Sequence, residues 1–130
     1  MRYGFEKSLV GTTFEQAIEK VTAALKSEGF GVLAEINIKE TLKKKMGVDF
    51  RRYVILGACN PDLAHRALEF EPHIGLLLPC NVVVQEAPKG GVLVSMADPR
   101  AMFMMVDNVA IASIADEADQ RLRKVFALIE

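Results

Sequence analysis

The chain has 130 residues, of which 51% are hydrophobic and 25% are charged. This size and composition fit a single domain over residues 1–130 with a core that needs no disulfides, and they exclude intrinsic disorder. The formal net charge of -1 gives no positive field to gather a nucleic acid or an anionic membrane, so neither is an expected partner.

The N-terminal segment MRYGFEKSLVG lacks the unbroken apolar stretch of a secretory signal peptide. No window reaches the roughly 18 consecutive apolar residues that a membrane-spanning helix requires. We therefore expect a cytoplasmic protein. Thiols stay reduced in that compartment, so Cys59 and Cys80 are first interpreted as free thiols or ligands rather than as a structural bridge.

A strand and a helix are predicted first along the chain. Residues 2–9 can form the strand. Thr12 or Thr13 begins the helix, and Glu15 lies three residues after Thr12, as in a capping box. Gly29 suits the end of this helix. Its apolar residues recur at helical spacing, namely Phe14, Ala17, Ile18, Val21, Ala24 and Leu25.

Residues 30–38 alternate between apolar and polar side chains, which predicts a strand with one wet face. Apolar residues at four-residue steps then predict a short helix that ends at Gly47. Residues 50–59 carry apolar groups on both faces, so we expect a central strand that is covered on both sides. The one basic cluster, which we interpret as a solvated face rather than a phosphate site, consists of Lys43, Lys44 and Lys45 near Arg51 and Arg52.

The second half of the chain predicts a helix, a hairpin and a last helix. Asn60 followed by Pro and Asp is a strong helix start, and this helix stops before Pro72. Residues 80–85 and 92–96 form the hairpin. Asp98-Pro99 then breaks the pattern. The last helix presents an apolar stripe between Ile111 and Ile129 and places charged residues outside, namely Asp116, Glu117, Asp119, Arg121, Arg123 and Lys124.

This order of elements predicts an α+β fold, with a largely antiparallel sheet and helices packed on one face. Several strands have apolar residues on both faces, and a single helical layer covers only one of them. A symmetric partner chain is the simplest cover for the other face, because a two-fold contact needs only one self-complementary patch. We therefore expect a homodimer.

A thiol lies at a strand-to-helix junction, where Cys59 precedes Asn60. The positive end of a helix favours a thiolate, so this is the geometry of an activated cysteine. The alternative is that Cys59 is a small buried apolar residue before the cap. Cys80 opens another strand and precedes Asn81. If the two strands are neighbours, the thiols come close enough for a disulfide or a shared ligand.

The spacing of the cysteines and histidines gives only weak support for a metal site. His65 lies six residues after Cys59 and His73 lies seven before Cys80, which matches neither a CxxC nor a CxxH pair. Zinc needs four convergent donors, or three and a water. These cysteines and histidines would bind it only if the fold brings them together, and solvated or core histidines are the alternative. The sequence leaves the metal and any cofactor unknown.

Methionines gather after Pro99, where Met102, Met104 and Met105 surround Phe103. Soft thioethers would suit copper(I) or a haem edge. The alternative that we favour is an adaptable hydrophobic lid or interface patch. The chain contains no phosphate-binding loop and no GxSxG or HExxH motif, so enzymatic activity is not favoured.

Two stretches, ILGACNP at 55–61 and GLLLPCNVVV at 75–84, resemble the prokaryotic family catalogued as domain of unknown function 302. The resemblance runs from the helix after Thr12 to the closing helix, and the methionines of residues 102–108 depart from it. It implies a TATA-binding-protein-like fold in the order β-α-β4-α and assembly as dimers. It implies no established reaction, and the name of a fold transfers no DNA binding.

Three hypotheses follow for the function. The first is a dimeric binding module for a small apolar or soft ligand. The second is a thiol-dependent protein in which Cys59 and Cys80 bind a soft metal or haem iron, or cycle as a redox pair. The third is a purely structural interaction subunit. Under the first hypothesis the ligand-binding residues are Cys59, Asn60, Cys80, Asn81, Met102 and Met105.

Overall fold

The computed structural model describes all residues, 1–130, and contains one antiparallel sheet of five strands. The strand order across the sheet is β1-β5-β4-β3-β2. This confirms the α+β class and the largely antiparallel sheet. The strands are β1 (Gly4–Leu9), β2 (Gly31–Asn37), β3 (Tyr53–Cys59), β4 (Cys80–Glu86) and β5 (Val92–Ala97).

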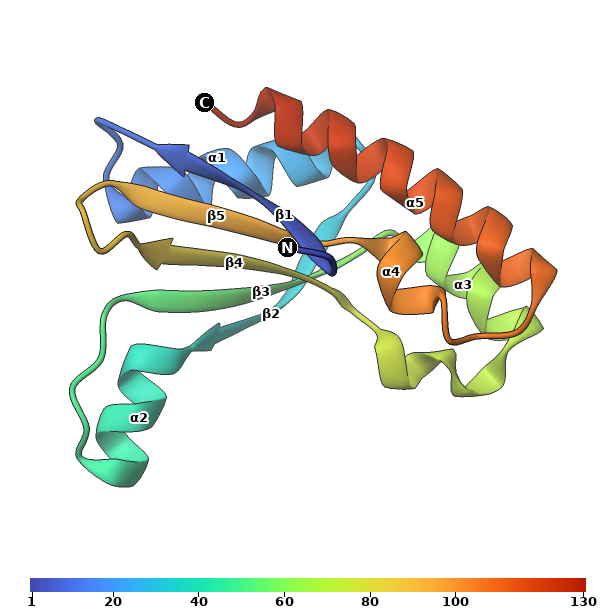
Figure 1. Ribbon diagram of the computed structural model, residues 1–130, viewed down its shortest axis with the longest axis horizontal. Helices are drawn as coiled ribbons and strands as arrows, with labels where there is room; N and C mark the ends of the chain where they lie inside the picture. The colour runs from blue at the N-terminus through green and yellow to red at the C-terminus, as the bar shows by residue number, and fades with distance from the viewer.

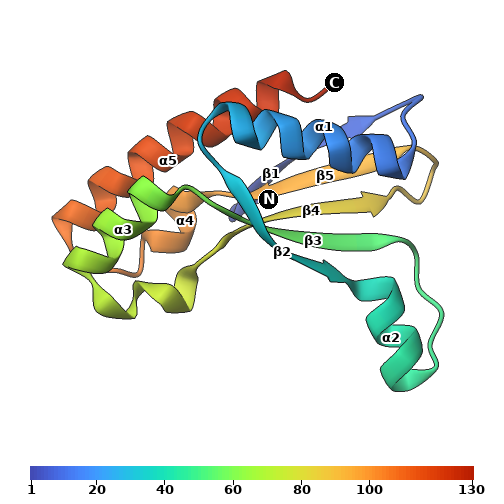
Figure 2. The same cartoon turned by 180° about the vertical axis from the view of Figure 1, so that it is seen from behind.

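The helices occupy three places around the sheet. Helices α1 and α5 lie along one face, α3 and α4 lie beyond one end of the strands, and α2 projects from the side opposite α1 and α5 (Figure 1, Figure 2). The prediction of helices on one face is therefore right for α1 and α5 and wrong for α2. The helices are α1 (Phe14–Ser27), α2 (Ile38–Met46), α3 (Pro61–Phe70), α4 (Pro99–Phe103) and α5 (Val109–Leu128), with a 3₁₀ helix η1 (Pro72–Leu77).

None of these helices combines the length and the apolar character that crossing a bilayer requires.

Of the two predicted starts of helix α1, Thr12 and Thr13, the structure uses Thr13. Thr13 is its N-cap, and the Thr13 Oγ1 accepts the Gln16 backbone N–H at 3.1 Å while the Gln16 side chain accepts the Thr13 N–H at 3.0 Å. The predicted pairing of Thr12 with Glu15 is wrong. Glu15 lies one residue too early to reach back to Thr13, and it binds Arg52 of the β3 approach at 2.5 Å instead.

The main core lies between the sheet and helices α1 and α5. Alternate residues of the three inner strands point into it, as the two-residue period of a strand requires. Each fully buried Leu or Val contributes about 1.5–3 kcal/mol. The strand residues buried here are Val54, Leu56 and Ala58 of β3, Val82 and Val84 of β4, and Val92, Val94 and Met96 of β5.

A second, smaller hydrophobic cluster of 8 buried residues lies beyond the end of the sheet. It joins α3, η1, α4 and the first half of α5. Ile111 and Ile74 are fully buried there, and Phe103 of α4 packs against them. The protein thus has two adjoining apolar cores rather than one.

One strand prediction is corrected by the sheet order. Strand β4, not β3, is central, because β3 has only the edge strand β2 beyond it. The second face of β3 is open: Ile55 lies there, opposite Val83 of β4 and Ile36 of β2, and these side chains are only partly buried. Ile36 remains 47% exposed. An apolar face of the sheet therefore has no cover within the chain.

One charged residue of the last helix is not outside. Asp119 is 2% exposed, because it faces α4 and not solvent. Its carboxylate accepts hydrogen bonds from Arg123 Nε at 3.1 Å and 3.2 Å and lies 3.6 Å from Arg100 Nε. A buried carboxylate is retained only when it is paired in this way.

Candidate functional site

A small, partly open cavity lies where β3 ends and α3 begins, at the boundary between the two cores. Its volume is about 30 Å³, and 11 of its 13 lining residues are hydrophobic. Both cysteines line it. The structure therefore brings together the two thiols that lie 21 positions apart in the sequence. The apolar walls include Phe30, Leu63, Leu78, Pro79 and Phe103.

The pairing of β3 with β4 sets the relative position of the thiols. Ala58 lies opposite Cys80 in the antiparallel register, and Cys59 is the next residue. Gly57 makes this approach possible: a Cβ atom at this position would lie 2.9 Å from Pro79 Cγ and 3.5 Å from the Ala34 Cβ. Because Gly57 has no side chain, Pro79 packs directly on the strand and forms the cavity wall beside Cys80.

Both cysteines are free thiols. Burial raises the pKa of Cys59 above that of an ordinary thiol. Burial also raises the pKa of Cys80, to about 11, and the negative charge of a Cys59 thiolate adds to this increase. Of the two interpretations of Cys59, the raised pKa favours the small buried apolar residue over the activated thiolate, because loss of hydration is the cause of the shift.

Asn60 has a structural role beside the thiols. It is buried, and its Oδ1 accepts the Leu63 backbone N–H at 3.2 Å, so it caps α3. Its Nδ2 donates to the Glu28 carbonyl at 3.3 Å, just after α1 ends. The same side chain therefore caps the helix, lines the cavity and ties α3 to the end of α1.

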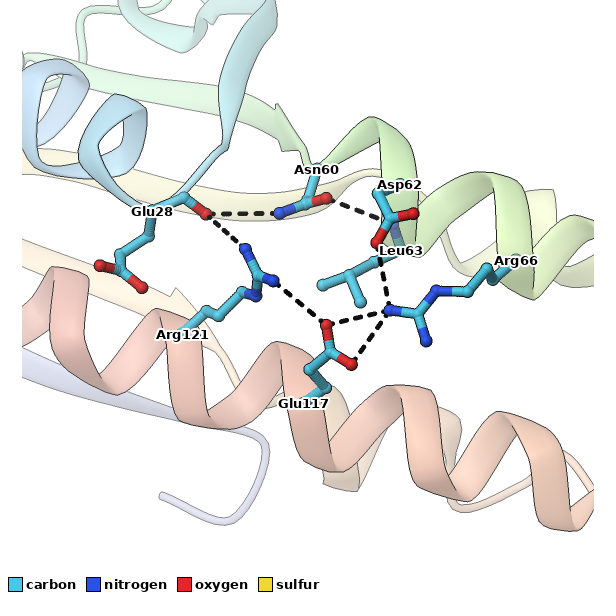
Figure 3. Close-up of polar contacts among 7 residues, drawn as sticks. All are labelled: Glu28, Asn60, Asp62, Leu63, Arg66, Glu117 and Arg121. Carbon is cyan, nitrogen blue, oxygen red and sulfur yellow. Dashed lines mark hydrogen bonds and ion pairs between the residues drawn. The ribbon is translucent and has the colours of Figure 1, made fainter.

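A chain of polar contacts extends from this point across three helices (Figure 3). The Glu28 carbonyl also accepts from Arg121 at 3.4 Å, and Arg121 lies 3.3 Å from Glu117. Both carboxylate oxygens of Glu117 accept from Arg66, at 3.0 and 2.9 Å, which raises the pKa of Arg66. Arg66 also donates to Asp62 at 3.3 Å. These contacts hold α3 against α5 and keep the cavity closed on that side.

The sequence analysis did not find this network as a unit. The four-residue spacing of Asp62 and Arg66, and of Glu117 and Arg121, is visible in the sequence and is typical of helical ion pairs. The contact between Arg66 and Glu117 joins residues 51 positions apart, and no local pattern indicates it.

The remaining predicted site residues lie outside the cysteine cavity. Asn81 is exposed on the open face of β4. Met102 is partly buried and lines an adjoining cavity of about 30 Å³ together with Asn81 and Cys80. Met105 is 76% exposed and lines neither cavity. Phe103 lines both cavities, a role that its position among the methionines did not indicate.

The histidines do not join the cysteines. His65 is exposed on α3, where its Nε2 lies 2.9 Å from Glu69. No group of three or more His, Cys, Asp or Glu side chains comes together in a geometry that could hold a metal ion. A zinc site built from Cys59, Cys80, His65 and His73 is therefore not formed.

Comparison with known proteins agrees with this architecture. The family described as domain of unknown function DUF302 matches residues 6–129. The chain belongs to this family. It is also similar to the crystal structure of an uncharacterised conserved DUF302 protein from Bacillus stearothermophilus, with 32% sequence identity, a TM-score of 0.90 and coverage of 100% of both chains. No curated protein sequence matches the chain.

The contact between Gly57 and Pro79 predicts a specific sensitivity. We expect Gly57→Ala to lower the free energy of unfolding by about 1–3 kcal/mol, the usual cost of overpacking, because the new methyl group overlaps Pro79. Gly31→Ala in β2 is the matched control, since a Cβ there meets nothing within 4 Å. Urea denaturation of both variants measures the difference, and equal stability would show that Pro79 moves aside freely.

The raised thiol pKa values predict slow alkylation. At pH 7.5 we expect Cys59, in the Cys80→Ala variant, to react more slowly with iodoacetamide than it does in the urea-unfolded chain. The rate should rise about tenfold per pH unit through neutral pH, because the thiolate is the nucleophile. Cys80 in the Cys59→Ala variant should react slowest. Mass spectrometry follows both reactions, and faster reaction of folded Cys59 would indicate activation.

Proposed function

We propose that the protein is a binding module for a very small, soft ligand held between Cys59 and Cys80. The observation that carries this proposal is that two free thiols line one apolar cavity. Pockets for drug-sized molecules and cofactors have volumes of about 300–1,000 Å³, against about 30 Å³ here. A haem or a large apolar ligand does not fit this cavity, whereas a single soft ion does.

A soft monovalent cation such as copper(I) or silver(I) matches the donors. Thiolate and thioether sulfur select soft metals, whereas hydrated hard cations gain little from apolar walls. An apolar cavity also favours a neutral complex. One cation with one thiolate and one thiol is neutral, and we assign the thiolate to Cys59, because Cys80 is the more deeply buried thiol.

Binding is better supported than redox cycling of the same pair. Thiol-disulfide exchange needs a thiolate as nucleophile. Burial raises the pKa of both thiols, so little thiolate is present at neutral pH. A cation, by contrast, replaces the proton and stabilises the negative sulfur.

The proposal predicts thiol-dependent binding of silver(I). We expect one silver(I) per chain, measured by competition with a chelator of known affinity, and loss of this binding in Cys59→Ala/Cys80→Ala. Because the cation displaces one proton, the affinity should rise about tenfold per pH unit below the pKa of Cys59. The control is His65→Ala/His73→Ala, which should bind as the unmodified chain does. Unchanged affinity in the double cysteine variant would refute the proposal.

We also propose that the protein is a homodimer formed through the open face of the sheet. Support comes from the apolar patch of Ile36, Ile55 and Val83, which no element of the chain covers. Helix α2 adds to this argument. It lies beside the open face and buries none of its residues, although a nine-residue helix is marginal without packing. A two-fold contact would cover both features at once.

We also propose a fold class and a cellular location. A TATA-binding-protein-like fold class is supported by the element order, in which β2 to β5, with short helices inserted among them, lie between α1 and α5. A cytoplasmic location is supported by the free thiols, since they persist in reducing compartments.

The dimer predicts a strong effect of charge on the open face. We expect the unmodified chain to scatter light as a dimer at micromolar concentration and Ile36→Glu to be monomeric, because the interface would bury an unpaired carboxylate. Leu128→Glu is the control, since Leu128 is also exposed, at 59%, but lies on α5, on the covered side of the sheet. A monomeric unmodified chain would exclude this assembly.

A further inference from the structure

We infer that Met102 is the sulfur donor through which a soft monovalent cation reaches the cysteine pair from the open face of the sheet. This inference rests on the proposed function, because it specifies the path of a ligand to the same cavity. Three adjoining cavities carry it, and each pair of neighbours shares lining residues.

The outermost of these cavities is a pocket of about 250 Å³ on the open face, at the end of the sheet where β5 leads into α4. It is wide enough to admit a hydrated or weakly complexed ion. Met1 and Met102 contribute to its lining, together with Tyr3, Asn81 and Ser95. Helix α2 and Ile36 lie toward the opposite end of the strands, whereas Val83 belongs both to this pocket and to the apolar patch of the proposed dimer.

The middle cavity lies between this pocket and the cysteine cavity and shares lining residues with each. Asn81 and Met102 line both the outer pocket and the middle cavity of about 30 Å³. Cys80, Pro79 and Phe103 line both the middle cavity and the cysteine cavity. Of the methionines that line the outer pocket, Met102 alone also lines the middle cavity, so the path inward runs from Met102 to Cys80 and then to Cys59.

The order of these donors suits transfer. A thioether binds a soft cation without releasing a proton and holds it weakly, whereas a thiolate holds it tightly. In the first step the bond to Met102 breaks as a bond to the neutral Cys80 sulfur forms. In the second step a bond to the Cys59 sulfur forms as its S–H bond breaks, and the proton leaves to water. The cation stays monovalent throughout, and one proton is released.

The other methionines do not line the middle cavity: Met1 and Met96 reach only the outer pocket. Met104 lines a different groove, between α4 and α5, together with Arg100 and Asp116. That groove shares only Phe103 and no sulfur donor with the cysteine cavity. Phe103 is 6% exposed and fills the space between them. Met104 is therefore a matched control for Met102 on the same short segment.

The test is the rate of silver(I) uptake from a weak chelator, measured by stopped flow. We expect Met102→Leu to take up silver(I) about tenfold more slowly, equivalent to ~1.4 kcal/mol on the transfer barrier. Its equilibrium affinity should stay near that of the unmodified chain, because Leu keeps the volume of Met and leaves both thiols. Met104→Leu should behave as the unmodified chain does.

A second variant tests whether the Met102 side chain binds the cation or only blocks its path. Met102→Ala widens the connection, so uptake should accelerate if the side chain only blocks the path and should slow if its sulfur carries the cation. Slow uptake in both Met102 variants supports the inference, and an unchanged or faster rate in either overturns it. If the unmodified chain binds no silver(I), the proposed function fails as well. If the unmodified chain binds silver(I) and Met102→Leu takes it up at the same rate, the inference about Met102 fails and the proposed function stands.

Discussion

The position of both thiols depends on one close contact, that of Pro79 with the backbone of Gly57. It brings the start of β4 against the end of β3 and leaves Cys80 opposite Ala58. The two stretches that carry the family resemblance, 55–61 and 75–84, are the two sides of this contact. These two stretches therefore form one local structure. The ring of Pro79 packs where Gly57 has no side chain, and each strand contributes one cysteine, Cys59 or Cys80.

Polar contacts hold the helices around the cavity in place, whereas its apolar walls keep the thiols protonated. Asn60 and the network from Glu28 to Asp62 satisfy the helix ends and hold α3 in place. Inside, the walls contribute almost no polar group, so the thiols keep their protons. The start of a helix would favour a thiolate, yet the Leu63 N–H at the start of α3 donates to the Asn60 side chain and not to Cys59. Desolvation consequently decides the state of Cys59.

Hydrophobic periodicity predicted most of the architecture, because strand and helix periods are local properties. It placed α1, α3, the hairpin and α5 correctly, and it made the meeting of Cys59 and Cys80 conditional on neighbouring strands, which β3 and β4 are. The errors concern tertiary neighbours. Asp119 is paired with Arg100 of α4, which no local pattern indicates. The site extends to Met102 of α4 but not to Met105, which lies beyond the end of this helix and is exposed.

The boundary between the two hydrophobic clusters has a mechanical consequence. One side of the cysteine cavity is formed by Phe30 and Ala58 of the larger cluster, and the other by Leu63, Phe103 and Ile114 of the smaller one. Regions with fewer buried contacts open at lower free energy. We therefore expect α3 and α4 to move away from the cavity at a lower free energy than the strands separate from one another. The packing of the eight buried residues in the smaller cluster, rather than that of the whole chain, then sets how far the cavity can widen around a ligand.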